Sequence, residues 1–144
     1  MMLTNLAAGT VLIALTVLIH TIGLIAVTHT MAWLVAHFRM HGRRSRIFAM
    51  ITVVFGLFAV LTVEVWLWAL SYLVIGAFPD FATGLYFSTV TFSTLGFGDV
   101  IPPREWRLFA ALEAINGFLL IGWSTAYLIA ASTRIGPFRS GEHF

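Results

Sequence analysis

The sequence predicts an all-α membrane protein with three transmembrane helices and one shorter, re-entrant helix between the last two. Of its 144 residues, 60% are hydrophobic and only 10% are charged, whereas a soluble domain usually carries about a quarter charged residues. Three apolar segments are long enough to cross a bilayer, and a fourth is too short. A soluble chain of this length could not bury so much apolar surface.

The first predicted span lies in residues 1–46, an extra N-terminal transmembrane helix followed by a basic cytoplasmic loop. No Asp, Glu, Lys or Arg occurs from Leu6 to Phe38, which would make about 50 Å of α-helix. Because the hydrocarbon core is about 30 Å thick, this helix must tilt, protrude or break, for example near Gly23. The segment is too long for a signal-peptide core, and no basic residue precedes it.

Residues 47–133 form a second unit, with predicted transmembrane helices at 47–78 and 104–133. Between them, residues 81–93 would span only about 20 Å as a helix. That length cannot cross the core, so we expect this helix to enter the membrane and return. Its non-helical exit at 94–99 is tolerated at membrane depth only where it lines a water-filled path. Residues 134–144 are predicted to form a short cytoplasmic tail.

The most specific motif follows the short helix and contains alternating glycines. It reads T-F-S-T-L-G-F-G-D over residues 91–99. It resembles the selectivity-filter signature of potassium channels, T-x-T-T-V-G-Y-G-D, which it matches at Thr91, Thr94, Gly96, Gly98 and Asp99. The near-isosteric departures from that signature are Ser93, Leu95 and Phe97. The resemblance to the two-helix pore module of bacterial-type potassium channels covers 47–133, in the order outer helix, pore helix, filter and inner helix.

Such a filter replaces the hydration shell of a potassium ion with rings of backbone carbonyls. Glycine suits it because glycine reaches positive φ without strain. The resemblance implies that K⁺ is coordinated by the carbonyls of Thr94, Leu95, Gly96 and Phe97, with the Thr94 hydroxyl as the innermost ring and Gly98 completing the filter. The chain holds one filter copy and no internal repeat, so closing a ring requires a homotetramer.

The resemblance also implies which residues support the filter. In the family, the acid after the filter, here Asp99, bonds to an aromatic donor on the pore helix, which by position is Tyr86. Phe97 replaces the usual tyrosine, and Phe87 stands behind it where many channels have tryptophan, so both polar donors are absent. We therefore expect a less rigid filter. Val90 takes the place of a buried acid found in some channels.

Two positions, Asp80 and Gly117, allow more than one interpretation. Asp80 precedes this helix and can cap its N-terminus, or it can be a solvated loop acid. The C-terminal end near Ser93 directs its partial negative charge toward the central cavity, which favours a cation there. Gly117, in the middle of the inner helix, is either a gating hinge, as in related channels, or a small residue that permits close helix packing.

Ionisable residues inside the spans are costly and are usually functional or paired. Glu64 and His20 lie at similar depths, about 20 Å below the outer helix ends, so they can pair across the first two helices. Protonation of the histidine would then alter the packing of the first span. A neutral Glu64 that anchors helices is the alternative. Glu113 lies about 12 Å below the outer end, level with the filter, where it can bond behind the pore helix.

Arginine distribution predicts the orientation. Six of the eight basic residues flank the second and third spans on one side, namely Arg39, Arg43, Arg44, Arg46, Arg134 and Arg139. The positive-inside rule places these in the cytoplasm and the N-terminus and filter outside. Arg104 and Arg107 depart from the rule and are assigned to the outer mouth. A small subunit of this kind suggests a prokaryotic inner membrane.

The leading functional prediction is a passive, potassium-selective channel. A weakly selective monovalent cation channel is the alternative, because of Leu95 and Phe97, and a subunit of a potassium transporter is a third possibility. The absence of cysteine, of a metal-ligand constellation and of a Ser-His-acid arrangement argues against an enzyme. The expected partners are K⁺, the bilayer and further copies of the chain. No nucleic acid, other cofactor or soluble ligand-binding domain is expected.

Overall fold

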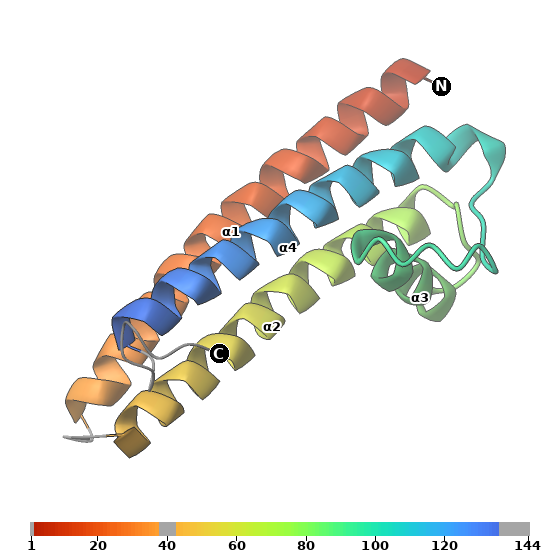
Figure 1. Ribbon diagram of the computed structural model, residues 1–144. Helices are drawn as coiled ribbons and strands as arrows, with labels where there is room; N and C mark the ends of the chain where they lie inside the picture. Colours follow the sequence, from red (N-terminus) through yellow and green to blue (C-terminus); the bar gives the residue numbers. More distant parts are fainter. Residues whose placement is uncertain (1, 38–42, 136–144) are drawn as a thin grey trace.

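The computed structural model describes residues 2–37 and 43–135. The elements in this part of the chain are α1 (Met2–His37), α2 (Arg43–Val74), α3 (Phe81–Phe92), the 3-10 turn η1 (Arg104–Trp106) and α4 (Arg107–Ile135), with no strand among them. Helices α1, α2 and α4 lie side by side, and α3 lies at the end of the bundle that also holds the start of α1 (Figure 1). Three helices are long and apolar enough to cross a membrane, so the predicted all-α membrane fold is confirmed.

The outer helix ends earlier than the sequence predicted. α2 stops at Val74 rather than at residue 78, because Gly76 adopts φ +70° just beyond its end. The Gly76 N–H donates to Leu73 O at 3.1 Å and the Ala77 N–H donates to Tyr72 O at 2.9 Å. This pair of bonds is the Schellman arrangement, in which a left-handed glycine closes a helix. The apolar residues that follow belong to the turn before α3.

The other predicted boundaries differ by a few residues. Arg43, Arg44 and Arg46 lie inside α2 and not in a loop. The inner helix begins with the η1 turn at 104–106 before α4, and α3 ends at Phe92, with Ser93 as its C-cap. α1 continues without a break through residue 23. Outside the described residues lie Arg39 and Arg139, which are predicted to be cytoplasmic, and the tail from 136 to 144.

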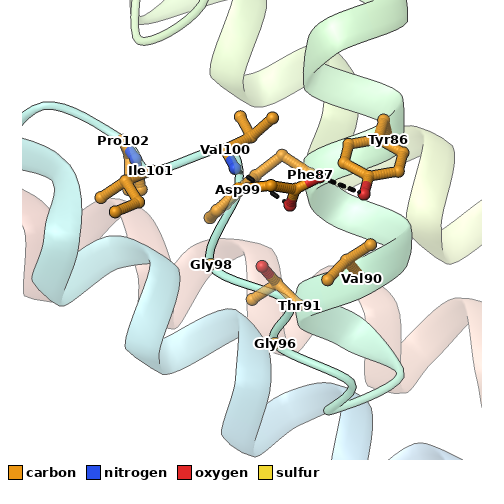
Figure 2. Close-up of a pocket in the computed structure, with 10 residues that line it drawn as sticks. All are labelled: Tyr86, Phe87, Val90, Thr91, Gly96, Gly98, Asp99, Val100, Ile101 and Pro102. Atoms are coloured by element: carbon orange, nitrogen blue, oxygen red, sulfur yellow. Dashed lines mark hydrogen bonds between the residues drawn. The ribbon is translucent and has the colours of Figure 1, made fainter.

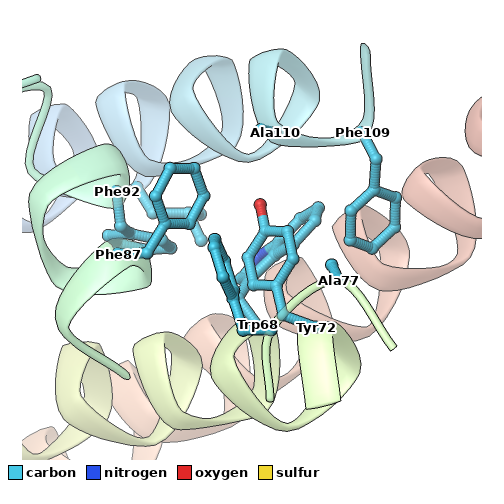
Figure 3. Close-up of a cluster of buried hydrophobic side chains, with 9 residues drawn as sticks. Trp68, Tyr72, Ala77, Phe87, Phe92, Phe109 and Ala110 are labelled. Carbon is cyan, nitrogen blue, oxygen red and sulfur yellow. The ribbon is translucent and has the colours of Figure 1, made fainter. Parts of the chain in front are cut away.

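An aromatic cluster joins α2, α3 and α4 at the end of the bundle that holds the short helix (Figure 3). Tyr72 stands at its centre, with ring centroids 5.1 Å from Phe87 and 5.4 Å from Phe109, both in edge-to-face geometry. Such pairs each contribute about 0.5–1.5 kcal/mol beyond area burial. Trp68 and Phe92 are also buried in this cluster. The cluster holds α3 in place between the two longer helices.

Helix α1 packs along both α2 and α4 through small residues and a few polar bonds. A Cβ added at Gly23 would lie 2.5 Å from Val60 Cγ2, so glycine permits this close approach. Toward α4, Asn116 Nδ2 donates to Thr16 Oγ1 at 2.8 Å. The first helix is therefore fastened to both helices of the predicted pore module, and not merely laid against them.

Candidate functional site

The short helix α3 begins at a capped N-terminus. Asp80 has extended backbone angles, and its Oδ1 accepts from the Thr83 N–H at 2.9 Å while its Oδ2 accepts from the Thr83 hydroxyl at 2.8 Å. Asp80 is thus the N-cap of α3, with its side chain exposed to solvent. The two bonds from Thr83 hold the pKa of Asp80 below its usual range, so the cap persists at neutral pH and is lost only as pH falls through the lowered value.

The chain turns sharply where α3 ends and then runs back along the helix. The Thr94 N–H donates to Thr91 O at 3.0 Å, and the N–H groups of Leu95 and Gly96 both donate to Val90 O, at 3.0 and 3.2 Å. Two backbone donors on one carbonyl fix the start of the loop against the last turn of the helix. Val90 therefore contributes its carbonyl oxygen to the site, besides a side chain that is 8% exposed.

The backbone of the glycine motif alternates between left-handed and ordinary conformations. Thr94, Gly96 and Gly98 have φ of +62°, +58° and +75°. Among the described residues other than glycine, Thr94 alone has positive φ, a state that costs about 1–2 kcal/mol for an L-residue. Alternation of this kind turns successive N–H groups toward one side, and the carbonyls consequently toward the other. Positive φ at the two glycines was expected from the sequence, whereas the strained conformation of Thr94 was not.

The loop is tied to α3 a second time at its far end. The Tyr86 hydroxyl donates to Asp99 Oδ2 at 2.6 Å, as predicted from the sequence (Figure 2). This bond lowers the pKa of Asp99, so it persists at neutral pH and fails only as pH falls through that lowered pKa. A crevice lies between α3 and the loop, lined by Tyr86, Phe87, Val90 and Thr91 on one side and by Gly96, Gly98 and residues 99–102 on the other.

The remaining predicted site residues differ in burial, the support residue Phe87 being buried and the loop residues Leu95 and Phe97 exposed. Phe87 is 7% exposed and packs against Tyr72 and Phe78 in the aromatic cluster. Phe97 and Leu95 are 66% and 61% exposed in the single chain. The structure therefore does not bring Phe97 against Phe87 within one copy. The Ser93 hydroxyl donates to Thr89 O at 2.6 Å and closes the last turn of α3.

A comparison with family models identifies this helix–loop–helix arrangement. A model described as "Ion channel" matches residues 58–134, more than half of the chain. The chain belongs to this ion-channel family. Searches of curated proteins and of solved structures found no match. The matched region of this ion channel contains most of α2, all of α3, the glycine loop and nearly all of α4, whereas α1 lies outside it.

Gly117 lies where the inner helix of the channel crosses the end of the pore helix. A Cβ added there would lie 2.1 Å from Phe92 O and 2.8 Å from Phe92 Cα. These are backbone atoms, which cannot move aside as a flexible side chain can. Of the two interpretations of this glycine, the structure favours close packing of α4 on α3.

The predicted pair of His20 and Glu64 is present in the channel. His20 Nδ1 lies 2.9 Å from Glu64 Oε1, and both side chains are fully buried. The imidazole also lies 5.2 Å, between ring centroids, from the indole of Trp123 on α4. The second polar atoms, His20 Nε2 and Glu64 Oε2, are buried without a partner among the residues that the structure describes. The pair therefore joins α1 to the outer helix, and each residue depends on the other for its hydrogen bond.

We expect His20→Leu to destabilise the channel protein. It would leave Glu64 buried with neither oxygen paired, a change that typically lowers the free energy of unfolding by about 3–5 kcal/mol. Thermal unfolding in detergent would measure the loss, with His29→Leu, at an exposed position on the same helix, as the control. An unchanged unfolding midpoint would show that the pair does not hold α1. Separately, an unaltered pH response of ion current in His20→Gln would contradict a role of this pair in pH sensing.

Glu113 of the channel bonds behind the pore helix, at the place that the sequence indicated. Its Oε1 lies 2.5 Å from Ser88 Oγ on α3, and its Oε2 lies 2.5 Å from Tyr72 Oη on α2. Neither partner was predicted from the sequence. The signal available in the sequence was a polar residue among apolar neighbours, Tyr72 on one helix and Ser88 on another. Matching either residue to Glu113 requires the rotation of the helices relative to one another.

Proposed function

We propose that this ion channel conducts potassium ions passively and selectively. The observation that carries the proposal is the alternation of positive φ at Thr94, Gly96 and Gly98 within the T-x-G-x-G-D segment. Backbone of this form can turn a column of carbonyl oxygens toward one side, and such oxygens replace the hydration shell of K⁺. We assign the coordinating carbonyls to Thr94, Leu95, Gly96 and Phe97.

We further propose that four copies assemble around a common axis. A single column of carbonyls cannot surround an ion, and closed cyclic symmetry is the usual way to complete such a ring. Residues 94–99 are all exposed in the single chain. Large apolar side chains on α4 are exposed as well, among them Ile115, Phe118, Leu119 and Ile129. A surface of this kind is what neighbouring copies would cover.

The proposed orientation places the N-terminus and the filter outside, in a prokaryotic inner membrane. The start of α1 and the glycine loop share one end of the bundle (Figure 1). Arg43, Arg44 and Arg46 begin α2, and Arg134 lies at the end of α4. These arginines lie at the end of the bundle away from the glycine loop. The positive-inside rule favours the cytoplasm for the end that carries them.

Two other functions compete with selective conduction. Leu95 and Phe97 depart from the usual filter sequence, so a weakly selective cation channel is the first alternative. The second alternative is that the chain is a subunit of a potassium transporter.

Flux from proteoliposomes separates a channel from a transporter subunit. Vesicles loaded with potassium chloride and diluted into sodium chloride would contain a pH-sensitive dye and a proton ionophore, so that potassium efflux drives proton entry. We expect efflux that needs no other subunit and is blocked by barium, with protein-free vesicles as the control. Efflux that appears only with a second protein would contradict a self-sufficient channel.

A separate prediction concerns Phe97, the phenylalanine of the proposed filter. Phe97→Tyr adds a hydroxyl that can bond to a neighbouring group, a contact worth about 1 kcal/mol per copy. We expect unchanged selectivity and longer openings, because the filter is held more firmly. Single-channel recording measures both quantities, and an unaltered open lifetime would contradict the view that the phenylalanine loosens the filter.

A further inference from the structure

A buried acid on the inner helix joins the three helices that surround the filter. Glu113 bonds to Tyr72 on α2 and to Ser88 on α3 at 2.5 Å each. All three side chains are fully buried. Figure 3 shows the Tyr72 hydroxyl pointing from α2 toward α4. The acid therefore lies where the outer, pore and inner helices meet.

We propose that Glu113 is a protonated positioning residue. As a neutral carboxylic acid it donates one hydrogen bond to Ser88 and accepts one from Tyr72, and so it fixes the depth of the pore helix between its two neighbours. The consequence for ion conduction rests on the proposed channel function. The protonation and the helix contacts do not.

Counting protons across these contacts supports the neutral acid. Ser88 Oγ lies 2.5 Å from Glu113 Oε1 and also 2.9 Å from the backbone oxygen of Val65. A serine hydroxyl carries a single proton. Were Glu113 ionised, that proton could serve only one of the two acceptors, and the other contact would set lone pairs against each other. A proton on Oε1 lets Glu113 donate to Ser88, Ser88 to Val65, and Tyr72 to Oε2.

The surroundings of Glu113 contain no compensating cation among the described residues. α2 contributes the phenol of Tyr72, and α3 contributes the hydroxyl of Ser88. α1 brings Gly9 against the neighbouring Leu112, and its polar contact nearest along α4 is the neutral bond between Thr16 and Asn116. Among the described residues, the ion pair is that of His20 with Glu64, and Glu113 takes no part in it. A carboxylate buried without a cation is strongly disfavoured inside a membrane.

The contacts lead from Glu113 to the filter in two short steps. Ser88 precedes Val90 by one half-turn of α3, and Val90 O receives the N–H groups of Leu95 and Gly96. One turn further along α4, Gly117 lies against Phe92 O at the end of the same helix. The inner helix thus touches the pore helix at two levels. Glu113 supplies the polar contact, which sets the position, and Gly117 supplies the close approach.

Two substitutions separate a neutral acid from a carboxylate. Glu113→Gln keeps a donor for Ser88 and an acceptor for Tyr72, so we expect near wild-type unfolding temperature and conduction. Glu113→Leu leaves both hydroxyls unpaired, so we expect the unfolding midpoint to fall by about 5–10 °C and conduction to be lost. Glu105→Gln, at an exposed position outside α4, is the control. Damage by glutamine equal to that by leucine would overturn the proposal.

Infrared spectroscopy provides a direct measure of the proton. A carboxylic acid has a C=O stretching band that a carboxylate lacks. We expect the difference spectrum between the wild type and Glu113→Gln at neutral pH to contain this band. A difference spectrum showing a carboxylate instead would overturn the proposal. Because neither this spectrum nor the unfolding midpoint depends on ion flow, a protein that failed to conduct potassium would contradict the channel function and leave these two tests of Glu113 intact.

Discussion

Replacing Gly98 with alanine is expected to abolish potassium conduction. Gly98 has φ +75°, and an added Cβ would meet no atom within 4 Å in the single chain. Within one copy of the chain, strain and not crowding is therefore the reason for glycine here. An L-residue held in this conformation costs about 1–2 kcal/mol in each copy, and relaxing the strain would turn a carbonyl away from the ion path. Potassium flux into proteoliposomes measures the loss.

Gly76→Ala is the matched control for this prediction. Gly76 also has positive φ, +70°, and open space around an added Cβ, but it lies just beyond the end of α2 and outside the glycine loop. Alanine there meets the same kind of strain without turning a carbonyl of residues 94–99, so flux should persist in this variant. Full potassium flux through Gly98→Ala would show that the left-handed backbone at this position is not needed for conduction.

Gly117→Ala should have the second-largest effect, and by a different physical route. Its methyl group would lie 2.1 Å from Phe92 O, so α4 must move away from the end of α3. Overpacking of this kind costs about 1–3 kcal/mol per site. We expect a lower unfolding midpoint in detergent together with reduced flux, because the helix that carries the filter loses its support.

Gly122→Ala controls for helix propensity at this second site, because Gly122 also lies inside α4 and an added Cβ there meets no atom within 4 Å in the single chain. The gain in propensity is similar at both glycines, so any difference between the two variants reports the contact with Phe92. A Gly117→Ala protein that is as stable as Gly122→Ala, yet altered in its gating, would favour the hinge interpretation over close packing.

The helix ends show why composition alone predicts spans better than it predicts their limits. The apolar run of the outer helix continues to Phe78, yet α2 ends at Val74 because Gly76 takes a left-handed conformation. A glycine at this position followed by Pro79 is a local signal for a helix end. Hydropathy gives these turn residues no weight against their apolar neighbours.

The glycine loop and the residues that support it were predictable to different degrees. The glycine motif is read directly from the residue order. The Tyr86–Asp99 bond was expected from the resemblance to potassium-channel filters, in which both partners have fixed positions within one short segment. The partners of Glu113 come from α2 and α3, and matching them requires the rotation of three helices. Similar depth along two adjacent helices was enough to pair His20 with Glu64, because ionisable groups inside membrane spans are usually paired.

The most direct test of the account is the reversal potential of current through the purified protein. The protein would be placed in a planar bilayer with potassium chloride on one side and sodium chloride on the other. Our proposal predicts reversal near the potassium equilibrium potential. Reversal near zero would contradict potassium selectivity and would mean that a filter with Leu95 and Phe97 admits sodium as well.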